Sequence, residues 1–434
     1  MKKSWKSNYT AILFAETLAM AGFALSMPVI PLFLEEDIGV RDPQTLKLWV
    51  GVIQSVAAVF LALFAPIWGH LADVYSRRMM LLRALFGGAA VISLMVFVRE
   101  PWQLLVLRAI QGCLTGTIAA ATVMTAAIVP AARVALALGL LQTGIAIGNS
   151  VGPMIGGVLS DFLGHRVAFL STGLVLAAAG LIILKWVEDD GKRPRAEGTL
   201  SQTLSPAQSP VSQSPPEEQK RRGASFLPDI NPILNSPVLI TLMFVTFTTQ
   251  AANTTASPML PLFLKELALR GMGGDPEFIG SATGIVLGAG AAATALAAVL
   301  AGKYSTHFGY WKTLIFCLCA GTICIVPQAF VTNMIQLTVF RTMSSFFIGG
   351  TAPVLNAIIA VNADKKHQGS VYGFNSSVSS AGGALGPMIG SAAAMINYRA
   401  VFLATAFILG LSSWGTIHRQ GKLRQKEGEE TKNT

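Results

Sequence analysis

Charged residues inside the apolar stretches of this sequence are few. Glu16 is the only acidic residue well inside such a stretch, and Arg108 and Arg341 are arginines in two others. An ionised group in hydrocarbon is costly and marks a functional site by default, and a carboxyl group there can exchange protons. An arginine at that depth stays charged and needs a partner. The chemistry open to these residues is proton transfer and electrostatic control.

The elements that must position these residues are membrane-spanning helices. The 434 residues are 52% hydrophobic and 12% charged, with a mean hydropathy of +0.57, whereas soluble domains carry about 25% charged residues. Apolar stretches long enough to cross a membrane as helices recur along the chain, and none shows the alternation of a membrane β-barrel. We predict twelve spans, at 10–34, 47–69, 79–98, 102–125, 134–159, 165–186, 237–263, 278–302, 311–331, 334–360, 369–394 and 398–417.

The distribution of basic residues predicts the orientation of these spans. With the N-terminus inside, the inner segments and their adjoining helix ends hold 23 of the 32 Lys and Arg residues, and the outer ones hold 7. Both termini are therefore expected in the cytoplasm, in a cell inner (plasma) membrane. The net charge of +10 fits attraction to anionic lipid of the bilayer and needs no nucleic-acid partner. The basic N-terminus MKKSWKS precedes an uncleaved first helix, because no small-residue cleavage site follows it.

The chain repeats itself. MPVIPLFLEE at 27–36 matches SPMLPLFLKE at 257–266, and GPMIG occurs at 152–156 and again at 386–390. Such matches in one order predict an all-α integral membrane fold made of two pseudo-symmetric six-helix bundles, with a substrate site where they meet. We expect these segments: an N-terminal bundle, 1–186; a disordered cytoplasmic linker rich in Ser, Pro and Gln, 187–236; a C-terminal bundle, 237–418; and a cytoplasmic tail, 419–434.

Four sequence motifs stand out. They are GHLADVYSRRMML at 69–81, LLVLRAIQG at 104–112, GFALSMPVIPLFL at 22–34 and GLLQTGIAIGNSVGPMIGG at 139–157. In the last motif, the four-residue spacing of Gly148, Gly152 and Gly156 puts these glycines on one stripe, where a neighbouring helix can approach closely. Pro153 is expected to bend that helix, and the prolines of 22–34 are expected to bend the first. The second glycine copy, at 373–391, ends in Ser391 instead of a glycine.

Together these motifs resemble those of the twelve-helix drug:proton antiporters of the major facilitator superfamily. The resemblance implies a latch between the two halves, made by Gly69, Asp73, Arg77 and Arg78, although Val74 and Ser76 depart from the family pattern. It also implies proton coupling by Glu16 and Arg108. The 139–157 motif implies a tight, leak-limiting contact through Gly139, Gly148, Gly152, Pro153, Gly156 and Gly157.

Each implied role has a plainer structural alternative. The latch residues could simply be positive-inside charge, and Arg108 could be a structural arginine that reaches towards the surface. Glu16 is expected only about 9 Å from the inner end of its span, so it could reach the inner surface or pair with a base in a loop. Arg108 is expected in the opposite leaflet, and a direct pair with Glu16 is not predicted.

The candidate substrate cavity is mostly apolar with a few uncharged polar groups. Met and Phe give adaptable contacts, which suit a broad lipophilic specificity, and no mid-span cation is available to bind phosphates or dicarboxylates. Each residue could equally serve helix packing. The candidates are Met20, Phe23, Gln142, Asn149, Phe247, Gln250, Asn253, Phe346 and Asn375.

These patterns predict a secondary transporter that exports hydrophobic or cationic drug-like compounds in exchange for protons, by alternating access and as a monomer. Export of an endogenous sugar, metabolite or lysolipid through the same fold is the alternative, and a non-transporting sensor or scaffold is a third possibility. No nucleotide-binding loop or catalytic constellation indicates an enzyme, and no cofactor is expected. The four cysteines all lie in spans and suggest neither a metal site nor a disulfide framework.

Overall fold

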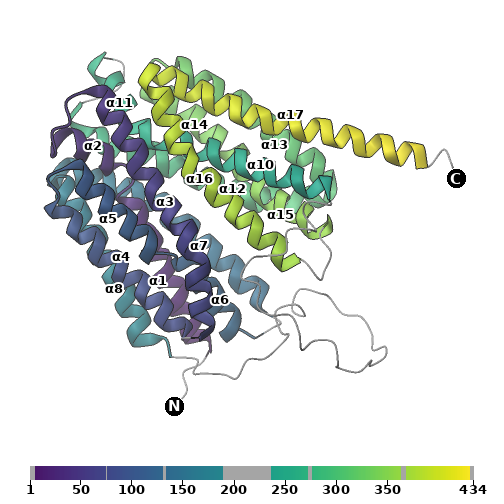
Figure 1. The fold of residues 1–434 in the computed structure, drawn as a ribbon, viewed down its shortest axis with the longest axis horizontal. Helices are drawn as coiled ribbons and strands as arrows, with labels where there is room; N and C mark the ends of the chain where they lie inside the picture. The colour runs from purple at the N-terminus through teal and green to yellow at the C-terminus, as the bar shows by residue number, and fades with distance from the viewer. Residues whose placement is uncertain are drawn as a thin grey trace.

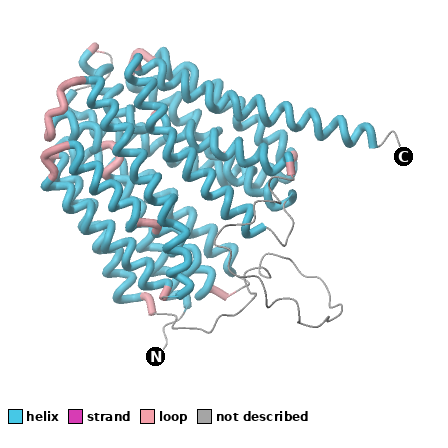
Figure 2. Tube along the Cα trace, viewed as in Figure 1, coloured by secondary structure: helices cyan, strands magenta, loops and turns pink. Residues whose placement is uncertain are grey.

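The computed structural model of the chain describes residues 5–74, 76–130, 133–188, 236–271, 276–362 and 368–430. These residues form helices joined by short turns and contain no strand (Figure 2). The expected linker lies outside the described residues, apart from its ends at 187–188 and at 236.

Within the described residues, the N-terminal half contains eight α-helices. They are α1 (Trp5–Leu25), α2 (Val29–Glu36), α3 (Pro43–Val74), α4 (Arg77–Leu94), α5 (Pro101–Leu114), α6 (Thr117–Ile128), α7 (Val134–Leu163) and α8 (His165–Trp186). The C-terminal half repeats the arrangement with α10 (Pro237–Thr255), α11 (Leu260–Leu269), α12 (Ile279–Phe308), α13 (Tyr310–Ile325), α14 (Met334–Gly349), α15 (Thr351–Asn362), α16 (Gln368–Ile396) and α17 (Tyr398–Glu430). Short 3-10 turns supplement them: η1 (Met95–Phe97), η3 (Ser257–Met259), η4 (Pro276–Phe278) and η5 (Val326–Phe330).

The twelve predicted spans coincide with these helices or with pairs of them. Nine are long and apolar enough, within the described residues, to cross a membrane. The other three predicted spans fall on α7, on α10 with α11, and on α16. The final helix α17 continues to Glu430, well into the expected tail, because Lys, Arg, Gln and Glu there are good helix formers.

Breaks in two spans of each half follow from proline and glycine. Pro28 and Pro31 lie where α1 gives way to α2, and Pro258 and Pro261 occupy the same place between α10 and α11. The predicted bend of the first span and its repeat are confirmed. Gly116, with φ +121°, separates α5 from α6, since a side chain at that φ would be strained.

The outer surface of the bundle is apolar, as lipid contact requires. Large hydrophobic side chains lie exposed along both halves; examples are Leu174 at 63% and Ile335 at 75%. A water-soluble protein rarely exposes so much contiguous apolar surface. The fold is therefore that of a membrane protein whose polar groups turn inward.

The two halves meet at one end of the bundle. We call the end where α1 begins at Trp5 the near end, and the end where α2 finishes at Glu36 the far end. Helix α7 packs on α12 and α3 packs on α16, which joins the halves. In Figure 1 the ribbons of the two halves lie together at the top, around α2 and α11, and diverge towards the N-terminus.

Candidate functional site

Helix α1 carries Glu16 deep into the N-terminal half. The side chain is 1% exposed, and its Oε1 accepts a hydrogen bond of 2.9 Å from the Thr117 hydroxyl at the start of α6. Its Oε2 is buried and has no hydrogen-bond partner among the described residues. Because α1 begins at Trp5, before the predicted span, Glu16 lies about 16 Å along the helix. At 1% exposure it is shielded from solvent.

Arg108 on α5 is also buried, with a hydrogen-bond partner of its own. The side chain is 6% exposed, and its Nη1 donates to Gln111 Oε1 at 3.0 Å on the next turn. The ion pairs between described residues do not include one between Arg108 and Glu16. Its counterpart Arg341 donates to the hydroxyl of Ser257, at 2.9 Å, in the turn between α10 and α11.

The glycine stripe of α7 forms the predicted close helix contact. Gly148, Gly152 and Gly156 face the backbone of α1, where their nearest neighbours include the carbonyl oxygens of Thr17, Ala21 and Leu25, respectively. A Cβ atom at any of these glycines would overlap that backbone. Pro153 lies inside the same helix, and a Cβ atom added at Gly139 would meet no neighbouring element within 4 Å. The packing role therefore belongs to the stripe and does not extend to Gly139.

Gly157 turns the other way and joins the two halves at the far end. It lies against the backbone of Gly280 in the first turn of α12, with no room for a side chain. One turn further along α7, the carboxylate of Asp161 accepts the backbone N–H groups of Gly280, at 2.9 Å, and of Ser281, at 2.7 Å. A carboxylate at a helix N-terminus is stabilised by the unpaired N–H groups and the helix dipole.

Sequence reasoning missed Asp161. The available signal was an acidic residue four positions beyond Gly157 and just outside the predicted span. That position reads as an ordinary outer-loop charge, because the sequence does not show that α12 begins opposite it.

The matching contact between α16 and α3 uses side chains instead. The Ser391 hydroxyl donates to the Lys47 carbonyl at 2.5 Å, and Lys47 Nζ donates to the Ala394 carbonyl at 2.8 Å. Gln44 Nε2 donates to the next carbonyl, of Met395, at 3.1 Å. Lys47 and Gln44 thus satisfy carbonyl groups at the end of α16, where a cation is favourable, whereas Ser391 donates in the opposite direction, to a carbonyl of α3.

A salt bridge adds to the far-end closure. Lys265 on α11 lies 2.7 Å from Glu36 and 3.1 Å from Glu35 on α2, so it connects the halves. Burial lowers the pKa of Lys265, but the two carboxylates outweigh burial and leave its pKa above the ordinary lysine value. The neighbouring Asp37 pairs within its own half, with His165 at 2.7 Å and with Arg166 at 3.2 Å.

The predicted latch residues lie at the near end. Gly69 and Asp73 belong to the last turns of α3, and the surroundings of Gly69 and the side chain of Asp73 lie outside what the structure describes. Arg77 and Arg78 begin α4, which Ser76 caps by accepting the backbone N–H of Met79. Arg78 donates to the Leu184 carbonyl of α8 at 2.5 Å. This contact stays within the N-terminal half.

The nine predicted cavity residues do not share one environment. Met20 is buried against Gly148, and Phe23 packs on Gly88 of α4. Asn375 accepts a hydrogen bond of 2.8 Å from Thr246 within the C-terminal half. The others divide into exposed polar side chains and partly buried ones: Gln142, Asn149 and Asn253 are exposed, and Phe247, Gln250 and Phe346 are partly buried.

Comparison with known proteins places this geometry in a family. The family model described as Major Facilitator Superfamily matches residues 12–330 and again residues 243–433. The chain belongs to the major facilitator superfamily. It is thus a multi-pass membrane protein that moves a small-molecule substrate by alternating access, and it is not an enzyme.

Individual relatives agree with this membership. The multidrug resistance protein MdtG of Proteus mirabilis is 32% identical over 407 residues, covering 94% of each chain. MdtG of Serratia proteamaculans is 31% identical over 422 residues, covering 96% of this chain and 95% of the relative.

Solved structures share the superfamily fold. The nucleoside transporter NupG has a TM-score of 0.75 at 11% identity, with 94% of this chain and 99% of that chain covered. A bacterial homologue of the human lysosomal transporter Spinster also has a TM-score of 0.75, at 14% identity, with 96% and 97% covered.

Proposed function

We propose that the protein is a proton-driven exporter of hydrophobic or cationic drug-like compounds. The observation that carries the proposal is the buried carboxyl group of Glu16, which has one hydrogen bond, from Thr117, and a second oxygen without a partner. Such a group can hold a proton when neutral and can attract a cationic substrate when ionised. Two relatives that bear the name multidrug resistance protein support the same substrate class.

The proposed membrane orientation follows from the charge pattern, and the proposed conformational state follows from the contacts at the far end. With both termini in the cytoplasm, the near end faces the cytoplasm and the far-end contacts close the outside. The arrangement is then the inward-facing state of the alternating-access cycle. Opening the outside requires Gly157, Asp161, Ser391 and Lys265 to release their partners.

A proton and a cationic substrate then compete for the carboxylate of Glu16. An ionised Glu16 favours the cationic substrate from the cytoplasm, and a proton arriving from outside displaces that substrate. The halves 1–186 and 237–418 move against each other as one monomer, with 187–236 as a passive cytoplasmic tether. The Asp73 loop would latch the near end in the outward-facing state, and Arg108 would tune the charge near Glu16.

Uptake of a lipophilic cationic dye by inverted membrane vesicles tests the proposal, because an exporter in such vesicles moves its substrate inward. We expect dye accumulation to depend on an inside-acidic pH gradient and to be lost in Glu16→Gln. An uncoupler should abolish the wild-type signal. Full pH-driven accumulation by the variant would overturn the role of Glu16. Gradient-driven transport of a sugar or lysolipid with none of the dye would overturn the substrate class.

The near-end latch needs a separate variant. We expect Asp73→Asn to lower the rate of dye efflux because the outward-facing state loses a stabilising charge. Unchanged transport would remove the latch assignment without affecting the role of Glu16.

A further inference from the structure

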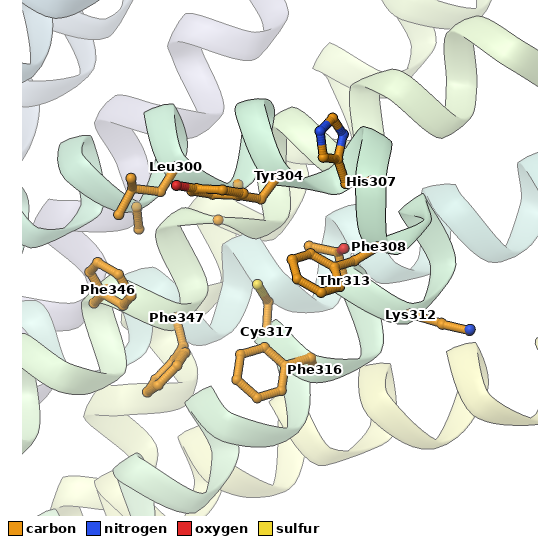
Figure 3. A pocket seen from close by; sticks show the side chains of 13 residues that line it. Leu300, Tyr304, His307, Phe308, Lys312, Thr313, Phe316, Cys317, Phe346 and Phe347 are labelled. Carbon is orange, nitrogen blue, oxygen red and sulfur yellow. The ribbon is translucent and has the colours of Figure 1, made fainter.

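A pocket lies within the C-terminal half, away from the contact between the halves. Its volume is about 630 Å³, within the size range of small-molecule sites. Helices α12, α13 and α14 supply its lining, together with Gly350 just after α14, and no residue of the N-terminal half takes part. Figure 3 shows aromatic rings around it, and the large apolar side chains of the lining are Leu300, Tyr304, Phe308, Phe316, Phe346 and Phe347.

One end of this pocket is basic. His307 and Lys312 belong to its lining, where α12 ends at Phe308 and α13 begins, and the described residues that line it include no acidic one. The amine of Lys312 points away from the rings (Figure 3), as a lysine does when its stem lies on apolar surface and its charge reaches the membrane interface. The ammonium group of Lys303 adds a second cation, 5.6 Å from the Tyr304 ring.

The corresponding place in the N-terminal half is filled. At the offset of 233 residues that aligns Arg108 with Arg341, Ala301 of the pocket corresponds to Trp68. The Trp68 indole donates to the Cys113 carbonyl at 2.6 Å, and the Arg83 guanidinium lies 3.4 Å from its ring centroid. A tryptophan thus occupies in one half the space that an alanine leaves open in the other.

The chemistry of the pocket favours a lipid over a transported compound. A carrier by alternating access needs its substrate site between the halves, whereas this lining belongs to one half. A basic rim repels cationic substrates and attracts anions. The apolar lining alone selects little, because lipid tails are as apolar as Leu; selectivity must come from the rim.

We propose that this pocket binds an anionic phospholipid of the leaflet at the near end. One acyl chain lies between α12 and α13, along Phe316 and Phe347, and the phosphate lies by Lys312 and His307. Basic pockets between helices on the cytoplasmic side of a membrane are suited to such headgroups. The inner-leaflet location rests on the proposed orientation, but the binding chemistry does not.

Native mass spectrometry of the purified, delipidated full chain tests the proposal. Phosphatidylglycerol and phosphatidylcholine with identical acyl chains are titrated separately. We expect the first bound phosphatidylglycerol to be preferred about fivefold or more, since each lysine at the surface contributes roughly that factor. Soluble glycerol phosphate, which offers the headgroup without a chain, should not compete.

Three variants locate the site. Ala301→Trp copies the filled N-terminal half and should abolish the preferred binding, while Lys312→Ala should weaken it about fivefold. Lys185→Ala is the matched control, because Lys185 lies in the last turn of α8 at the near end of the other half. Each variant is compared at an unchanged Tm and as a monodisperse protein. If Ala301→Trp is unstable, Leu300→Phe serves as the filling variant.

Three results with lipid alone would overturn the proposal. They are equal binding of the two lipids by the wild type, retention of preferred binding in a folded filling variant, and an equal loss in Lys185→Ala and Lys312→Ala. Displacement of the lipid by the transported dye would instead assign the pocket to substrate and would also overturn it. These experiments measure lipid binding and not transport. Failure of the proposed export function would therefore leave the lipid-binding results interpretable.

Discussion

The two halves of the molecule have the same plan but place different chemistry at matching points. At the offset that aligns 27–36 with 257–266, Glu16 corresponds to Thr246. The N-terminal position holds a buried carboxyl group with an unpartnered oxygen, whereas Thr246 donates to Asn375 in a neutral pair. Both halves use this position for helix packing, but only the N-terminal half places an acidic group there.

The far-end contacts show the same kind of difference. On one side, Gly157 allows two backbones to meet and Asp161 places a negative charge on the start of α12. On the other, Ser391 and Lys47 donate to carbonyl groups, and Lys47 places a positive charge at the end of α16. Each side satisfies helix-terminal groups with the sign of charge that its terminus favours. Ser391 is therefore an alternative closure rather than a defective glycine.

The largest expected effect distinguishes Glu16 from its counterpart. Glu16→Gln should reduce pH-driven dye accumulation by on the order of tenfold or more, because the amide cannot exchange a proton. Thr246→Ser keeps the hydroxyl that pairs with Asn375 and should retain most of the wild-type rate. Reconstituted proteoliposomes with an imposed pH gradient give both rates. Equal losses in the two variants would mean that the halves do not differ in coupling.

Much of the plan behind this comparison could be predicted from the sequence. Hydropathy located the twelve spans, and repeated sequence segments revealed the duplication. The spacing of Gly148, Gly152 and Gly156 predicted the close contact with a neighbouring helix. The spans and the glycine stripe are local features, since each depends on the residue pattern within one helix, and the duplication is visible because the sequence itself repeats.

The partners of the polar groups could not be predicted in the same way. Thr117 reaches Glu16 from 101 positions away, and Asp161 reaches Gly280 from 119 away. Such contacts depend on how far each helix is rotated and shifted, and one sequence does not record that. For the same reason Phe346, expected in the substrate cavity, lines a pocket of the C-terminal half.

The second prediction compares the last residues of the two copies of the glycine motif, Gly157 and Ser391, at the far end. Gly157→Ala introduces a Cβ where the Gly280 backbone lies, and should destabilise the closed far end by about 1–3 kcal/mol. Ser391→Ala removes one hydrogen bond and should cost about 1 kcal/mol. Spin labels on cysteines introduced at Arg41 and Leu269, in a background without native cysteines, report the far-end distance. A larger opening in Ser391→Ala than in Gly157→Ala would reverse the comparison.

The third prediction concerns the charge on the start of α12. Asp161→Asn keeps one carbonyl oxygen for Gly280 or Ser281 but loses the anion, so closure should weaken by about 0.5–1 kcal/mol. The same spin-label pair measures the shift, and high salt should reduce it only slightly because the contact is partly buried. An unchanged distance distribution would show that the hydrogen-bond geometry, and not the charge, closes this side.

The smallest effect is expected at Lys265, and its pH dependence separates it from Glu16. An exposed ion pair contributes about 0–1 kcal/mol, so Lys265→Met should open the far end less than Gly157→Ala. Because the pKa of Lys265 is raised, its stabilisation is complete below the ordinary lysine pKa of about 10.4 and is lost only above it. The effect of Lys265→Met on the spin-label distance should therefore be constant from about pH 6 to pH 9. Glu16→Gln, in contrast, should remove the pH dependence of dye transport. A Lys265→Met effect that changes across this range would contradict the assignment of this closure to the charge of Lys265.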